Sequence, residues 1–162
     1  MSLDATARES NVRDSLKKYF TDSLKSSEKI PITFDTSLSV PKLQGKDVDR
    51  WVSIRIGPMK RVTLSEVIVS FYCCTRKDNE GFRLAQLGDT VMGCLTPDSD
   101  DEDNTDGIKR ICLYRSASGG YTNWEEVGSL LVTNIDESSE MITTDKTKYK
   151  ILTVTVNWIA KV

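Results

Sequence analysis

The fold is decided by residues 66–95, whose sequence is EVIVSFYCCTRKDNEGFRLAQLGDTVMGCL. Apolar side chains occupy both faces of residues 67–74, which predicts a central β-strand that is covered on both sides or whose second face meets a partner. After this strand, Asp78 or Asn79 can cap a helix that ends before Pro97. The apolar residues of the helix recur at helical spacing and are Leu84, Leu87, Val91, Met92 and Leu95. The segment therefore predicts a strand followed by an amphipathic helix.

The rest of the chain adds one more helix and several strands. A second apolar stripe consists of Val12, Leu16, Tyr19, Phe20 and Leu24. It predicts an N-terminal helix over about residues 4–26, with Asp4 as its N-cap. Alternation predicts strands at residues 51–57, 63–75, 107–115, 124–135, 141–143 and 150–162. We expect Gly57 and Pro58 to end the first of these strands. Residues 30–50 should form a long irregular loop, at the start of which Ile32 and Phe34 can make a short extended piece.

These elements predict a single α+β domain over residues 1–162. We expect an antiparallel or mixed β-sheet of about five strands. A long helix packs on one face of the sheet, and the N-terminal helix covers the same face or one edge.

Composition and charge exclude several classes of protein. The net charge is −2, from 22 basic and 24 acidic residues, whereas a nucleic-acid-binding domain normally presents a concentrated basic face. The first residues lack the basic and apolar regions of a signal peptide, and no apolar run approaches the ~20 residues that cross a bilayer. We therefore expect a cytosolic protein in the producing cell, with no membrane partner and no specific nucleic acid.

The sequence also offers little catalytic chemistry. It contains no histidine, which removes the commonest general base and most catalytic zinc sites. The four cysteines form no C-x-x-C pair, and we interpret them as core and semi-core residues: Cys73, Cys74, Cys94 and Cys112. No glycine-rich phosphate loop is present. We expect no enzyme activity, no cofactor, no metal site and no catalytic residues.

The most unusual local feature is an acidic run over residues 98–107, DSDDEDNTDG, with six acidic residues in ten positions. Its spacing does not fit a calcium-binding EF-hand loop, because Asp103 and Lys109 stand where glycine and glutamate are needed. We expect a solvated acidic loop, with divalent-ion binding or recognition of a basic partner as alternatives.

Taken in order, the elements resemble those of the tail terminator, or tail-to-head joining, proteins of long-tailed siphophages. The resemblance rests on the helix at 12–24, the extended Val40-Pro41 segment, the strands at 51–57 and 67–73, and the helix at 82–95. An Asp106-Gly107 turn and a chain end made of β-strand complete it. It covers nearly the whole chain as an order of elements and includes no diagnostic motif.

The resemblance implies a structural virion protein at the head-proximal end of the tail, present in the host cytoplasm during assembly. Such proteins form a ring, a hexamer in this family, on the completed tail tube. The ring stops polymerisation of the tube and presents a docking surface to the head-completion or connector protein. The implied partners are further copies of the chain, the tail tube protein and the connector.

Long loops and charged helix faces are the surfaces on which such assembly would depend. We therefore predict interface residues in the 30–50 loop and on the first helix: Val40, Pro41, Lys42, Lys46, Arg50, Lys18 and Lys25. One alternative is another phage neck or tail-tube structural protein. A different class of function is a small ion- or ligand-binding module that uses the acidic loop at 98–107.

Overall fold

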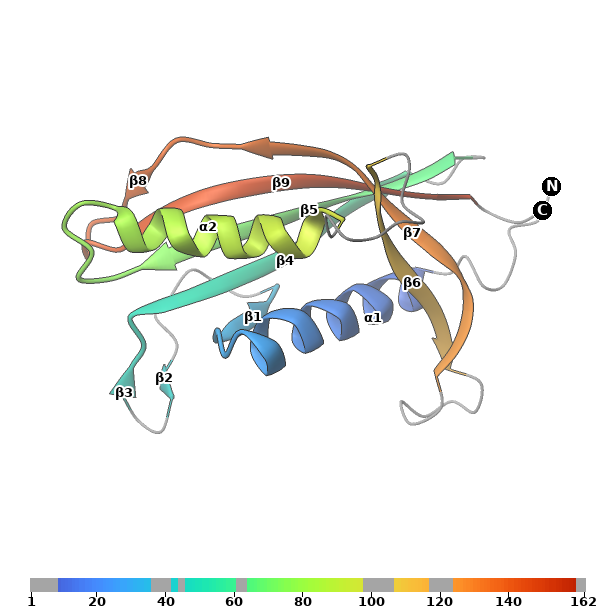
Figure 1. Cartoon of the computed structure of the whole chain (residues 1–162), viewed down its shortest axis with the longest axis horizontal. Helices are drawn as coiled ribbons and strands as arrows, with labels where there is room; N and C mark the ends of the chain where they lie inside the picture. Colours follow the sequence, from blue (N-terminus) through green and yellow to red (C-terminus); the bar gives the residue numbers. More distant parts are fainter. Residues whose placement is uncertain are drawn as a thin grey trace.

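A computed structural model describes residues 9–35, 42–43, 46–60, 64–97, 107–116 and 124–159 of the chain. Its main feature is a curled seven-stranded sheet with two helices on one face (Figure 1). The helical segments are α1 (Glu9–Phe20), the π-helical η2 (Thr21–Ser27) and α2 (Phe82–Leu95). The strands are β1 (Ile32–Phe34), β2 (Lys42–Leu43), β3 (Lys46–Asp47), β4 (Arg50–Lys60), β5 (Leu64–Thr75), β6 (Lys109–Ser116), β7 (Trp124–Glu137), β8 (Met141–Ile142) and β9 (Lys148–Ile159). The α+β fold with a mixed sheet agrees with the fold class predicted from the sequence.

The sheet has the order β1-β4-β5-β9-β7-β6, and β8 adds to one end of β9. Only β1 and β4 pair in parallel, and all the other pairs are antiparallel. The short strands β2 and β3 form a separate two-stranded hairpin. The position of β5 between β4 and β9 confirms that it is a central strand. Both helices pack on one of its faces, however, and Ile68 and Tyr72 on the opposite face are only half-buried within the described chain.

The core lies between the helices and one face of the sheet. The α2 stripe is buried as predicted at Leu84, Leu87, Val91 and Leu95, while Met92 is partly buried. The α1 stripe and its continuation are buried at Val12, Leu16, Phe20 and Leu24. At the centre, the ring of Phe20 packs edge-to-face on that of Phe71, with 4.8 Å between centroids. Both helices are therefore held by the same apolar layer.

The number of strands differs from the expected five because very short strands carry no periodic signal. β1 has three residues and coincides with the short extended piece that the sequence allowed at Ile32 and Phe34. It becomes a strand of the sheet because Ile32 and Phe34 pair with Val52 and Ile54 of β4, contacts that a local pattern does not encode. The β2–β3 hairpin lies further along the same segment, so the prediction of an irregular loop there was wrong.

The prediction that Gly57 and Pro58 end a strand was also wrong, because β4 continues to Lys60. The two residues instead form a bulge: Ile56 pairs with Val69, and Met59 pairs with Val67. Two residues of β4 thus stand opposite the single residue Ile68, where a proline without an N–H breaks no ladder.

The first helix is shorter than predicted as a regular α-helix, since it changes to π geometry at Thr21. Its proposed N-cap, Asp4, lies outside the described residues. The cysteines agree with the prediction except at Cys112. Cys73 and Cys74 are buried, Cys94 is partly buried, and Cys112 of β6 is exposed. No helix within the described ranges is long and apolar enough to cross a membrane.

Candidate interaction site

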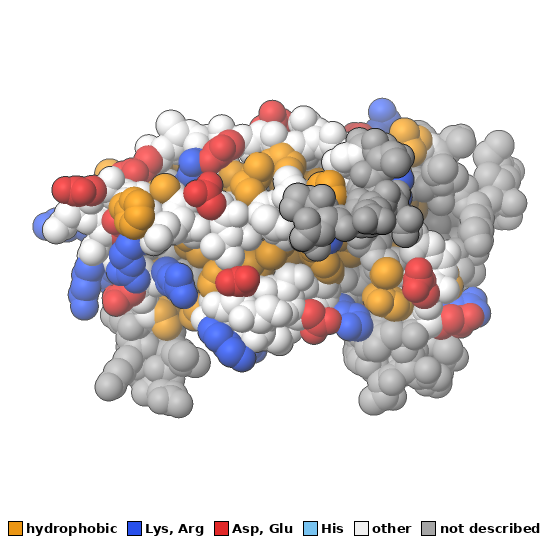
Figure 2. Space-filling view, in the orientation of Figure 1, with side chains coloured by type: hydrophobic (Ala, Val, Ile, Leu, Met, Phe, Trp, Pro, Cys, Tyr) orange, Lys and Arg blue, Asp and Glu red, His pale blue; other side chains and the backbone are white. Residues whose placement is uncertain are grey.

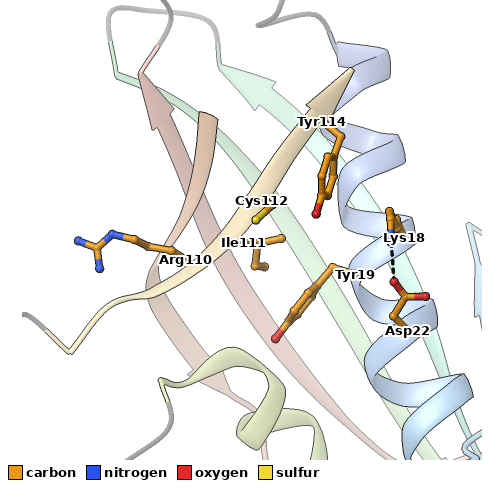
Figure 3. Close-up of a pocket in the computed structure, with 7 residues that line it drawn as sticks. All are labelled: Lys18, Tyr19, Asp22, Arg110, Ile111, Cys112 and Tyr114. Carbon is orange, nitrogen blue, oxygen red and sulfur yellow. Dashed lines mark hydrogen bonds and ion pairs between the residues drawn. The ribbon is translucent and has the colours of Figure 1, made fainter. Parts of the chain in front are cut away.

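A shallow groove of about 140 Å³ runs between the first helix and β6 (Figure 3). Residues of α1 and η2 form one side and residues of β6 form the other. The lining residues are Lys18, Tyr19, Asp22, Arg110, Ile111, Cys112 and Tyr114. The Tyr114 ring lies between the strand and the helix, whereas Arg110 points away from α1 (Figure 3). The groove is therefore a mixed surface of aromatic, thiol and charged groups.

The groove exists because α1 covers an open edge of the sheet. β6 is the last strand in the sheet order, so the outward N–H and C=O groups of its backbone have no strand beside them. The hydroxyl of Ser15, fully buried, accepts a hydrogen bond from the Tyr114 N–H at 2.8 Å and donates to the Tyr114 carbonyl at 3.4 Å. The Ser15 hydroxyl thus bonds both backbone groups of Tyr114 at the strand edge and fixes the position of α1 along β6.

The charges in the groove are mostly compensated within it. Lys18 Nζ lies 2.7 Å from Asp22 Oδ2 and 5.7 Å from the centroid of the Tyr114 ring. The hydrogen bond from Lys18 to Asp22 raises the pKa of Lys18 above its usual value, so the ammonium stays charged at neutral pH. The Lys18 ammonium therefore makes both an ion pair with Asp22 and a cation–π contact with Tyr114 of β6.

Tyr19 links the groove to α2. Its hydroxyl donates a hydrogen bond of 2.5 Å to the carbonyl oxygen of Cys94, and Lys109 Nζ lies 5.8 Å from its ring. Burial raises the pKa of the Tyr19 phenol, so it remains a neutral donor. Both aromatic rings are thereby held in place, which suits a contact surface for a protein partner.

The structure describes the side chains of three of the seven predicted interface residues, and these three lie at different places in the fold. Lys18 lies in the groove beside β6, and Lys25 is exposed on η2. Arg50 is exposed at the start of β4, on the other side of the sheet order from β6. Val40 and Pro41 lie outside the described residues, and Lys42 and Lys46 are described only by their backbone in the β2–β3 hairpin. The acidic run at 98–106 also lies outside the described part of the chain.

The sequence reasoning missed the β6 side of the groove. Alternation predicted the strand at 107–115, but no local signal shows that this strand ends the sheet beside α1. The decisive contact joins Ser15 and Tyr114, which are 99 positions apart in the chain. Within the ranges that the structure describes, no group of three or more His, Cys, Asp and Glu residues is placed to hold a metal ion.

Comparison with known proteins gives the fold and no family. No family model matches the chain, and no curated protein matches it. A solved structure whose title states no function superposes with a TM-score of 0.61 at 9% sequence identity. The match covers 93% of this chain and 95% of that one. At this identity, the likeness supports a shared fold over nearly the whole chain and says nothing about what the protein does.

Proposed function

We propose that the chain is a tail terminator of a long-tailed phage. In this proposal, copies of the chain form a ring on the head-proximal end of a completed tail tube. The ring stops further addition of tube subunits and provides the docking surface for the head-completion or connector protein. The protein acts by occupying a surface and has no chemical step.

The order of elements is the observation that carries this proposal. An N-terminal helix, two long antiparallel strands, a helix and an all-β chain end occur in that order in the family that the chain resembles. The described elements α1, β4, β5, α2 and β6 to β9 follow the same order. This agreement in the order of elements is what supports the proposal. The chain and the family share no diagnostic motif.

The two edges of the sheet give further support. One edge is the three-residue strand β1, and the other is β6, whose outward backbone groups at Tyr114 are bonded to Ser15 of α1. The two edges therefore differ in length, chemistry and covering. A ring built from identical subunits needs two different surfaces on each copy that meet head to tail, and a closed ring fixes the number of subunits.

The alternatives within the same class are a tail-tube subunit and another neck protein. A module that binds an ion or small ligand through the acidic run is the alternative from a different class. These proteins would differ in where they act: a terminator binds one end of a tube, whereas a tube subunit adds along its whole length.

Electron microscopy can test this difference directly. Gold-labelled protein would be incubated with tail tubes from a siphophage whose own terminator has been removed. We expect one labelled ring at a single end of each tube. Label along the tube walls would support the tube-subunit alternative, and tubes without label at either end would contradict the proposal.

A further inference from the structure

We propose that the open edge of β6 binds an extended acidic segment of a partner protein. In this contact, the segment lies in the groove between α1 and β6 and adds to the sheet as a further strand, through the backbone of Cys112. The inference names a contact that the terminator proposal does not require, and it can be tested without tail tubes.

The backbone of β6 points toward the groove at every second residue. Tyr114 turns its N–H and C=O groups away from β7, because both of them bond the Ser15 hydroxyl. In an antiparallel strand, residues two apart turn these groups in the same direction. The register shift beside Tyr114 places its additional residue in β7, so this alternation is unbroken along β6. Cys112 therefore also directs a donor and an acceptor toward the groove.

These two groups of Cys112 are open to an added strand. Cys112 is exposed, and its N–H and C=O groups bond no other residue in the part of the chain that the structure describes. The helix bonds the edge through Ser15 at Tyr114, which is two residues further along β6. Unpaired backbone groups at a sheet edge can accept another strand. The groove therefore contains the main-chain groups that strand addition needs.

The shape of the groove favours an extended chain over a small molecule. The groove is shallow, and its volume of about 140 Å³ is below the ~300–1,000 Å³ of typical small-molecule pockets. A small ligand would remain largely exposed there, whereas an extended chain along β6 gains main-chain hydrogen bonds without being enclosed. The rings of Tyr19 and Tyr114 line the groove and supply aromatic contact area for its side chains (Figure 3).

The side chains around the groove favour an acidic occupant. Among the described residues that line it, the cations are Lys18 and Arg110 and the carboxylate is Asp22, which forms an ion pair with Lys18 at 2.7 Å. Figure 2 shows hydrophobic side chains at the surface where α1 meets β6, with charged side chains beside them. The lining is thus an apolar and aromatic surface with an excess of positive charge, which carboxylates of a partner would complement.

The positive charge lies mainly at one end of the strand. Toward the C-terminal end of β6, Glu125 forms an ion pair with Arg115 at 2.8 Å, and Glu126 is exposed. At the start of β6, Lys109 and Arg110 follow one another. An acidic side chain of the added segment would therefore be attracted most strongly to the start of β6.

Fluorescence anisotropy with a labelled peptide of four Glu-Val repeats tests the inference on the full chain. The peptide combines negative charge with a β-branched residue that favours extended structure. We expect saturable binding of this peptide and at least about tenfold weaker binding of the matched peptide of four Lys-Val repeats, because like charges then meet. No saturable binding of the Glu-Val peptide, or equal binding of the two peptides, would overturn the proposal.

A proline at the edge tests the backbone contact. Cys112→Pro removes an N–H group that takes no part in pairing with β7, so the substitution is of the kind that edge strands tolerate. Cys112→Val keeps this N–H group and is the matched control. We expect the proline variant to bind the Glu-Val peptide at least about tenfold more weakly than wild type and the valine variant to bind like wild type. Equal binding by both folded variants would contradict strand addition.

Charge variants test the same site with the backbone unchanged. Lys109→Glu with Arg110→Glu should weaken binding of the Glu-Val peptide by at least about tenfold. Arg50→Glu with Lys60→Glu makes the same change of charge at exposed positions of β4 and is the control, with binding close to wild type. Circular dichroism shows whether each variant is folded. Equal weakening by the two pairs, or no weakening by the first pair, would contradict the assignment of this surface.

Hydrogen exchange measured by NMR locates the bound peptide. At saturation, exchange of the Cys112 N–H should slow, because this group then donates to the added strand. An unchanged exchange rate at Cys112 would overturn the assignment of the site. Sedimentation velocity without peptide examines whether a second copy takes the edge instead. Dimers of the wild type that are absent for Cys112→Pro would overturn the assignment to a partner's segment. These results leave the terminator proposal open, since binding to tube ends is measured separately.

Discussion

The carboxylate of Asp78 lies between the end of β5 and the start of α2 and accepts hydrogen bonds from both. Its oxygens accept from the Leu84 N–H at 2.9 Å, the Arg83 N–H at 3.4 Å and the Thr75 hydroxyl at 3.2 Å. The helix begins after Gly81, which adopts a left-handed backbone and has no side chain to act as a cap. Of the two capping residues that the sequence allowed, the structure selects Asp78.

We expect Asp78→Ala to lower the free energy of unfolding by about 1–2 kcal/mol, because two N–H groups of the first turn lose their acceptor. Asn79→Ala is the control, since Asn79 is exposed and its side chain makes none of these bonds. Urea unfolding followed by circular dichroism measures both variants. Equal destabilisation by the two substitutions would contradict the capping role.

The same cap makes stability depend on pH. Burial alone would raise the pKa of Asp78, but the hydrogen bonds from Leu84, Arg83 and Thr75 outweigh it and lower the pKa below the usual value. The Asp78 carboxylate therefore binds a proton more readily in the unfolded chain than in the folded one. Its contribution to the free energy of unfolding is complete above the normal aspartate pKa and is lost as the pH falls through the lower pKa of the folded state. The stability difference between wild type and Asp78→Ala should shrink as pH is lowered from 7 to about 3. A difference independent of pH would contradict this account.

The cysteines should differ sharply in reactivity. Burial, with the neighbouring Cys74 adding to the effect, raises the pKa of the Cys73 thiol to about 12, and burial raises that of Cys74 to about 12. The reactive thiolate is then nearly absent at pH 8 in both. Cys112 is exposed, so it should be the fast-reacting thiol in a disulfide-exchange titration of native protein. Cys112→Ser should remove the fast phase, and its persistence in this variant would contradict the assignment.

At the scale of elements, two glycines should respond in opposite ways to the same substitution. A Cβ on Gly57 would lie 2.9 Å from the carbonyl oxygen of Ile68, opposite the β4 bulge, whereas a Cβ on Gly93 of α2 would meet no atom within 4 Å. We expect Gly57→Ala to destabilise by about 1–3 kcal/mol through backbone displacement. Gly93→Ala should stabilise by about 0.5–1 kcal/mol, because alanine favours the helix. Thermal unfolding of the two variants measures whether each substitution raises or lowers the stability. A change in the same direction for both would contradict the packing described.

Long periodic elements were predictable from sequence because their own side chains encode them. β5, α2 and β9 lie within a few residues of the predicted positions, since each has enough turns or alternations to show its period. The pairing of β1 in the sheet and the continuation of β4 past Pro58 were missed because both depend on a neighbouring strand. The groove was missed for a related reason: Ser15 and Tyr114 meet only after the sheet has curled around α1, and no pattern near either residue reports that contact.

At the scale of the whole molecule, the β2–β3 hairpin is the element that the fold uses least. It pairs only with itself and contributes no strand to the seven-stranded sheet. We therefore expect deletion of residues 40–46 to leave the circular dichroism spectrum and the unfolding transition close to those of the wild type. The deletion should abolish ring formation on tail tubes, because it removes four of the predicted interface residues: Val40, Pro41, Lys42 and Lys46. A folded deletion variant that still caps tubes would exclude the hairpin as the assembly element.

The central claim is that this chain stops the growth of a tail tube, and the length of tubes grown in its presence tests it most directly. Purified tube protein would be polymerised from tail-tip complexes, and the chain would be added at a fixed time before electron microscopy. We predict that elongation stops at the length reached when the chain is added, with tubes capped at the growing end. The unfolded chain serves as control and should leave growth unchanged. Tubes that continue to lengthen in the presence of excess folded protein would contradict the account.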